Sequence, residues 1–178
     1  MERKKAVVTG ASRGIGNGIA RCLAREGYDL AISYATKQEE AQKLANELQK
    51  TYGGKCFCFQ ASLEKEGVGV ELLKKSVEAL GGLDLLVNNA GVTRFENILD
   101  LTPEVFDLLF HLDFKNYILM MQEAARYMVK NEVRGSLINI TSSRGERAYA
   151  GDFLYGGLKA GLNRAIQSIA LDLAPYGI

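Results

Sequence analysis

The chain has few cysteines, one histidine and almost no charge imbalance, and each scarcity excludes a class of protein. An odd count of three cysteines, Cys22, Cys56 and Cys58, without C-x-x-C spacing argues against a disulfide framework and against zinc. No His or Cys cluster surrounds His111, so we expect no metal site and interpret this histidine as a surface or interface residue. The net charge is only +1, which favours neither nucleic acid as a partner nor a disordered tail.

Long apolar runs are also absent. No stretch approaches the length that crosses a membrane, and the first residues lack the apolar region of a signal peptide. We therefore expect a cytoplasmic protein that binds neither membrane nor nucleic acid. A length of 178 residues predicts one domain, residues 1–178, with enough chain to bury a substantial core.

Glycine, in contrast, is plentiful, with 19 residues. One Gly-rich stretch follows a short apolar run and precedes apolar residues at helical spacing: Thr9-Gly10-Ala11-Ser12-Arg13-Gly14-Ile15-Gly16. A strand-to-helix turn of this kind brings a phosphate to the backbone N–H groups at a helix N-terminus. The alternative is a Gly-rich turn that binds nothing.

The rest of the chain alternates between strand-like and helix-like segments. We expect strands over 5–9, 28–34, 55–60, 85–87 and 135–141, and helices over 15–26, 39–51, 69–80, 103–131 and 153–174. This alternation predicts an α/β, three-layer, doubly wound Rossmann fold with a mostly parallel sheet. Thr102 and Pro103 are a typical helix start. Apolar residues on more than one face of the 103–131 helix indicate a second packing partner, such as another subunit.

A second group of residues suggests acid–base chemistry. Tyr155 and Lys159 are four residues apart on a predicted helix and share a face. A neighbouring ammonium favours the ionised form of a tyrosine, which makes it a usable general acid or base. Such a pair is common by chance, but Ser142 lies at the C-terminal end of the fifth predicted strand, where open α/β sheets bind ligands. Gly156-Gly157 inside a helix suggests a close approach, because each glycine costs about 1 kcal/mol relative to alanine.

With these motifs in order, the chain resembles the classical short-chain dehydrogenase/reductase family. The Gly-rich turn matches the family's TGxxxGxG, Asn88-Asn89-Ala90-Gly91 matches NNAG, and Tyr155–Lys159 matches YxxxK with Ser142 at the expected distance upstream. Within the family it is most similar to 3-oxoacyl-[acyl-carrier-protein] reductases and to sugar and polyol dehydrogenases. The resemblance implies a homo-oligomer, a dimer or tetramer, through the 103–131 and 153–174 helices.

The resemblance also implies roles for individual residues. Tyr155 would exchange a proton with the substrate oxygen, Lys159 would support Tyr155 and hold the nicotinamide ribose, and Ser142 would hydrogen-bond the substrate. The implied cofactor-binding residues are Gly10, Ser12, Arg13, Gly14, Ile15, Gly16, Tyr34, Ser62, Asn89, Ala90, Gly91, Tyr155 and Lys159.

Three features depart from the family pattern. Counting from the NNAG motif places Asp113 where the family has a catalytic Asn, so we expect a tolerated substitution that leaves proton relay there in question. Ser62 stands where the family commonly has Asp, and it can still accept a hydrogen bond. The family's further C-terminal strands and substrate-covering loop are absent after Ile178, so we expect the active protein to be longer.

The cofactor prediction depends on charge. No acid occupies the end of the second strand, Ser33-Tyr34-Ala35-Thr36-Lys37, where NAD enzymes place one to bind the ribose 2′-OH. Arg13 and Lys37 can instead attract a 2′-phosphate, so we expect NADP(H), with NAD(H) possible. The predicted activity is ketone–secondary alcohol interconversion by hydride transfer, with a small-molecule or acyl-thioester substrate. The alternatives are a sugar or polyol dehydrogenase, a non-catalytic nucleotide-binding member, and an interaction scaffold.

Overall fold

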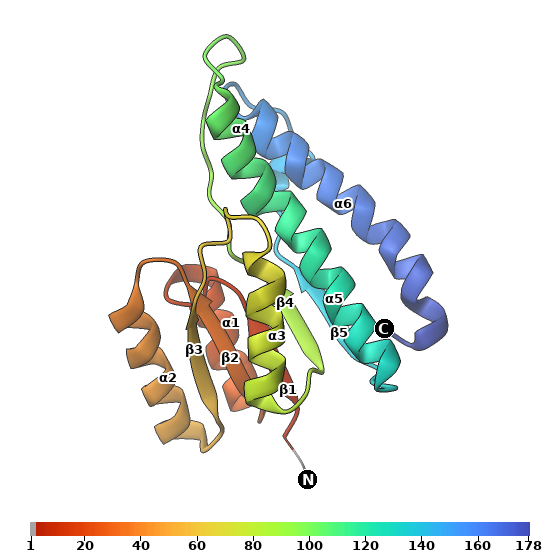
Figure 1. Ribbon diagram of the computed structural model, residues 1–178. Coiled ribbons are helices and arrows are strands. Elements are labelled where there is room, and N and C mark those ends of the chain that lie inside the picture. Colours follow the sequence, from red (N-terminus) through yellow and green to blue (C-terminus); the bar gives the residue numbers. More distant parts are fainter. Residues whose placement is uncertain (1–2) are drawn as a thin grey trace.

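A computed structural model describes residues 3–178 and contains one five-stranded parallel sheet (Figure 1). The strands run side by side in the order β3 (Cys56–Gln60), β2 (Asp29–Tyr34), β1 (Lys5–Val8), β4 (Leu85–Asn88) and β5 (Ser136–Asn139). All neighbouring pairs are parallel, as in the register Val7 opposite Ala31 and Leu86. The predicted α/β doubly wound sheet is therefore confirmed.

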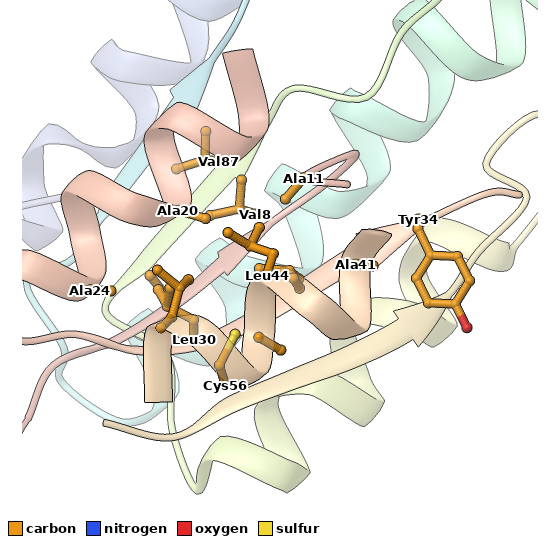
Figure 2. Packing of buried hydrophobic residues seen from close by; sticks show 14 of the residues in the cluster. Val8, Ala11, Ala20, Ala24, Leu30, Tyr34, Ala41, Leu44, Cys56 and Val87 are labelled. Carbon is orange, nitrogen blue, oxygen red and sulfur yellow. The ribbon is translucent and has the colours of Figure 1, made fainter. Parts of the chain in front are cut away.

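Helices cover both faces of this sheet, because successive strand residues point to opposite faces. Ala6 and Val8 pack toward α1 (Gly14–Arg25) and α2 (Gln38–Tyr52), and Figure 2 shows Val8 close to Ala20 and Leu44 from these helices. Val7, between them in sequence, belongs to the opposite core with α3 (Val68–Leu80), α5 (Asn116–Lys130) and α6 (Phe153–Leu173). The two cores give the three predicted layers.

The predicted 103–131 helix is present, but one turn in it is irregular. It comprises α4 (Pro103–Phe110), a π-helical turn (His111–Lys115) and α5, with helical backbone angles at both junctions. Thr102 caps it as predicted, since its side chain accepts a hydrogen bond from the N–H of Val105 at 3.4 Å. Single π turns are frequent at functional sites, and this one carries the buried residue Asp113.

The other predicted boundaries are correct to within one or two residues. The expected strand over 135–141 is shorter in the structure, Ser136–Asn139, and the expected helix over 153–174 ends at Leu173. Within residues 3–178, no helix has the length and apolar character needed to span a bilayer.

Candidate active site

The strand order reverses at β1, which has β2 on one side and β4 on the other. Connections after β1 and β4 leave in opposite directions at such a point, and the gap between them is where open α/β sheets bind ligands. A groove of about 490 Å³ lies there. Its walls come from the Gly-rich turn after β1, the end of β2, the segment after β3 and the NNAG segment after β4.

Two glycines of the turn allow these segments to approach. A Cβ at Gly10, whose φ is +66°, would stand 2.8 Å from Ala90 Cα. A Cβ at Gly16 would stand 2.5 Å from Asn89 Nδ2 and 2.6 Å from the Gly10 carbonyl oxygen. Glycine at both positions is therefore needed for α1 to begin directly against the turn and the NNAG segment.

The asparagines of the NNAG segment hold the site together from inside. The side-chain amide of Asn89 donates to the carbonyls of Thr9 at 2.8 Å and Gly10 at 3.1 Å. The buried Asn88 amide donates to Asn139 Oδ1 at 3.0 Å, linking β4 to β5. Both asparagine side chains therefore bond within the fold, and Asn89, Ala90 and Gly91 line the groove.

Most predicted cofactor residues line this groove: Gly10, Ser12, Arg13, Gly14, Ile15, Tyr34, Asn89, Ala90 and Gly91. Gly16 lies behind it, packed against Asn89. Ser62 does not line the groove, although its neighbours Ala61 and Leu63 do, and the Ser62 carbonyl accepts a hydrogen bond from Lys65 N–H at 3.0 Å.

One end of the groove carries positive charge. Arg13 and Lys37 both line it, and both are exposed. Lys37 Nζ lies 3.4 Å from Glu40 Oε1, an exposed ion pair that contributes little and leaves the ammonium accessible to solvent. Tyr34 ends β2 at this point, and its buried neighbour Ser33 accepts the N–H of Gly10 at 3.1 Å. Glu64 is the acidic residue among the lining residues.

The predicted pair on α6 lies beside the long helix. Lys159 Nζ is 5.6 Å from the centre of the Tyr155 ring and 4.6 Å from the centre of the Tyr117 ring. It is also 3.0 Å from Asp113 Oδ1, with both side chains buried. The structure therefore brings three of the four predicted catalytic residues, Asp113, Tyr155 and Lys159, into one cluster.

Burial dominates the electrostatics of this cluster. Removal from water raises the pKa of the Asp113 carboxyl, and the Lys159 ammonium opposes that rise by favouring the carboxylate. Burial also raises the pKa of Tyr117, and the charge of Asp113 adds to the effect. Tyr117 therefore stays protonated, and its hydroxyl donates to the Ala90 carbonyl at 3.0 Å.

The fourth residue, Ser142, precedes a short 3₁₀ helix, Ser143–Gly145, and its Oγ accepts the N–H of Arg144 at 3.2 Å. This turn packs so closely on α6 that a Cβ at Gly156 would stand 2.8 Å from the Arg144 carbonyl oxygen. The close approach expected at Gly156-Gly157 is thus made by the protein's own backbone, and only at Gly156, since an added Cβ at Gly157 meets nothing within 4 Å.

Two residues of this region were not singled out from the sequence. Tyr117 follows Asp113 by one helical turn and so shares its face. Arg144 lies in the loop that follows Ser142. Its guanidinium lies 4.8 Å from the Phe95 ring centre and 4.5 Å from the Tyr149 ring centre, and it pairs with buried Asp152 at 2.7 Å. Arg144 therefore joins the loops after β4 and β5.

The groove has the chemistry that a dinucleotide requires. The first N–H groups of α1, at Gly14, Ile15 and Gly16, have no partners within the helix, and aligned peptide dipoles favour an anion there. Arg13 and Lys37 supply positive charge at the adjacent end, and no side chain at Gly10 or Gly14 obstructs the backbone. These residues fit a pyrophosphate and a ribose bearing a further anionic group.

Comparison with known proteins agrees with this geometry. The family model for short chain dehydrogenase matches residues 4–178. The chain is 35% identical over 175 residues to a 3-oxoacyl-[acyl-carrier-protein] reductase of Staphylococcus epidermidis, covering 98% of this chain and 71% of the relative. It is 32% identical over 177 residues to an L-rhamnose 1-dehydrogenase (NADP(+)) of Thermoplasma acidophilum, covering 98% and 68%.

A solved structure of a short chain dehydrogenase from Burkholderia cenocepacia in complex with NADP superposes with a TM-score of 0.91. It is 36% identical, and the match covers 98% of this chain and 70% of that one. Sequence, fold and site thus lead to one conclusion: this chain belongs to the short-chain dehydrogenase family, and it is an oxidoreductase acting on CH–OH and keto groups.

Proposed function

We propose that this protein interconverts a ketone and a secondary alcohol by hydride transfer with NADP(H), in the manner of a 3-oxoacyl-thioester reductase. The observation that carries the proposal is the contact of Lys159 with the Tyr155 ring, 5.6 Å away, on a helix that packs against the segment from Ser142. Similarity to the Staphylococcus 3-oxoacyl-[acyl-carrier-protein] reductase supports the substrate class, and similarity to the Burkholderia protein in complex with NADP supports the cofactor.

Tyr155 is the proton donor in reduction and the proton acceptor in oxidation. Its hydroxyl would protonate the carbonyl oxygen as the hydride reaches the carbon, or remove the alcohol proton in reverse. Ser142 Oγ would orient the same oxygen by a hydrogen bond. Lys159, one turn along α6, lies 5.6 Å from the centre of the Tyr155 ring and would hold the nicotinamide ribose. The nicotinamide supplies or accepts the hydride when it is bound.

The preference for NADP(H) is argued from the charged end of the groove. Arg13 and Lys37 line it, and Tyr34 occupies the end of β2 where a carboxylate would repel a 2′-phosphate. Backbone N–H groups at Gly14–Gly16 would bind the pyrophosphate, and Ala90 and Gly91 would border the riboses. NAD(H) would bind the same groove more weakly, because it lacks the phosphate that these two cations attract.

A sugar or polyol dehydrogenase is the second candidate. The similarity to the L-rhamnose 1-dehydrogenase favours it, and so does the polar, exposed loop with Glu146 and Arg147 that follows Ser142. A non-catalytic nucleotide-binding protein is the third candidate. The presence of Tyr155, Lys159 and Ser142 together argues against it.

We also propose a homo-oligomer, a dimer or tetramer, formed through the long helix and α6. An apolar groove of about 520 Å³ runs between α5 and α6, lined by residues such as Ile118, Val129 and Ile169. Leu171 on α6 is 76% exposed. A second subunit seated there would bury these side chains.

The experiment is a panel of steady-state assays that follow NADPH by its absorbance. An acetoacetyl thioester and small diketones are tested in reduction, and sugars and polyols are tested in oxidation with NADP⁺. Turnover of the thioester supports the first candidate, and turnover confined to sugars supports the second. Tight NADPH binding without turnover of any compound would contradict both and leave the non-catalytic candidate.

A further inference from the structure

The buried contact between Asp113 and Lys159 places a carboxylate beside the ammonium that lies next to the Tyr155 ring. Lys159 Nζ and Asp113 Oδ1 are 3.0 Å apart, and the two side chains are 2% and 0% exposed. Water cannot screen charges at this depth, so the carboxylate offsets much of the positive field that the ammonium exerts on its surroundings.

The carboxylate is fixed in this position from two sides. The N–H of Val92 donates to Asp113 Oδ2 at 3.2 Å. Gly91 leaves room for the other oxygen, since a Cβ there would stand 2.5 Å from Asp113 Oδ1 and 3.8 Å from Lys159 Nζ. The pair is therefore part of the folded backbone arrangement and not a surface contact that exchanges with water.

Only a few ionisable groups face this ammonium among residues 3–178. They are Asp113 from the π-helical turn, Tyr117 from α5 and Tyr155 from its own helix. The nearby Arg144 and Asp152 neutralise each other at 2.7 Å. Tyr117 uses its hydroxyl on the Ala90 carbonyl, which leaves Tyr155 as the hydroxyl that can respond to the net charge of the pair.

We propose, resting on the proposed function, that Asp113 is a positioning residue that neutralises Lys159. It thereby shifts the pH dependence of proton transfer by Tyr155 to higher pH. A lone ammonium would favour tyrosinate strongly, whereas an ammonium paired with a carboxylate acts on Tyr155 only as a dipole. Lys159 also lies over the ring faces of Tyr117 and Tyr155, and aromatic ring faces stabilise a cation.

The test is Asp113→Asn, which keeps the shape and removes the charge. With the best substrate of the panel, the midpoint of the pH profile of kcat/KM is expected to move to lower pH by about one unit. A purely structural role for Asp113 would lower kcat and thermal stability without moving this midpoint. A profile that coincides with the wild type, or one that moves to higher pH, would overturn the proposal.

A second readout does not depend on turnover. Ionisation of tyrosine is followed by ultraviolet absorbance for the wild type, D113N, Y155F and D113N/Y155F. Among the eight tyrosines, one that ionises at lower pH in D113N should disappear from the double variant. If no compound is turned over but this signal appears, the proposed function fails while the inference about Asp113 holds.

A further variant covers the case in which D113N does not fold. Gly91→Ala retains the carboxylate but pushes Oδ1 away, because the new Cβ would lie 2.5 Å from it. The tyrosine signal should move in the same direction as in D113N by a smaller amount. Absence of any movement in a folded G91A protein would count against the proposal.

Discussion

Gly156 of α6 lies directly against the Arg144 backbone, so that a Cβ at position 156 would stand 2.8 Å from the Arg144 carbonyl oxygen. This contact seats the segment from Ser142 to Gly145 on the helix that carries Tyr155 and Lys159. The neighbouring Gly157 has open space where its Cβ would be. The two glycines therefore make a matched pair for testing how closely the turn from Ser142 to Gly145 must approach α6.

Gly156→Ala is expected to lower stability by about 1–3 kcal/mol, because overpacking displaces the Arg144 backbone. It should also lower kcat, since Ser142 moves with that turn. Gly157→Ala, in the same helix and exposed, should raise stability by about 0.5–1 kcal/mol and leave kcat unchanged. Urea unfolding and steady-state kinetics of both variants check this, and equal effects at the two positions would contradict it.

Tyr155→Phe is expected to lower kcat by about 10²–10⁴-fold, because it removes the proposed proton donor and keeps the ring. NADPH affinity, measured by fluorescence titration, should remain close to that of the wild type. Tyr117→Phe is the control, since Tyr117 donates its hydroxyl to the Ala90 carbonyl. Y117F should lose stability and keep most of its turnover. Comparable losses of turnover in the two variants would contradict the assignment of Tyr155.

Removing the two cations of the groove should change cofactor choice. In Arg13→Ala and Lys37→Ala, the ratio of kcat/KM for NADPH to that for NADH is expected to fall about tenfold or more. A hydrogen bond to a charged group contributes about 1.5–3 kcal/mol. Lys50→Ala is the control. It removes one positive charge from an exposed lysine at the far end of α2, as Lys37→Ala does at the groove, and it should leave the ratio unchanged. A wild-type preference for NADH would refute the NADP(H) proposal.

The buried thiol of Cys56 and the half-buried thiol of Cys58 should make the stability of the fold sensitive to alkali. Burial raises the pKa of Cys56 from 9.0 to about 12, and burial likewise raises that of Cys58 to about 11. Above pH 9 the unfolded chain releases these protons while the folded chain keeps them, so the free energy of unfolding falls as pH rises toward 12. Below pH 9 this contribution is fully present.

The measurement is urea unfolding at pH 7, 9 and 10. Cys56→Ala should show a smaller loss of stability with pH than the wild type, and Cys22→Ala, which alters an exposed thiol, should behave like the wild type. A parallel decline in all three proteins would assign the alkaline effect to other groups.

Much of the fold could be predicted because its signals are local. The glycine turn before a helical repeat, the Thr102 cap and the glycines that end α2 and α3 each act within a few residues. The π-helical turn at His111–Lys115 could not be predicted, since propensity does not distinguish it from the surrounding α-helix. Asp113 was placed by counting from the NNAG motif. Its partner Lys159 lies 46 residues further along the chain, and sequence periodicity does not predict contacts over that separation.

By itself, then, the sequence determined the strand and helix succession, the glycine-rich turn after the first strand and the shared face of Tyr155 and Lys159, because periodicity and backbone preference act over one or two turns. Only the tertiary structure decided that Asp113 pairs with Lys159. It also decided that the Arg144 carbonyl packs against Gly156 and that the Asn88 side chain joins β4 to β5. These contacts form between distant segments when the sheet assembles in the order β3-β2-β1-β4-β5, and packing alone sets their distances.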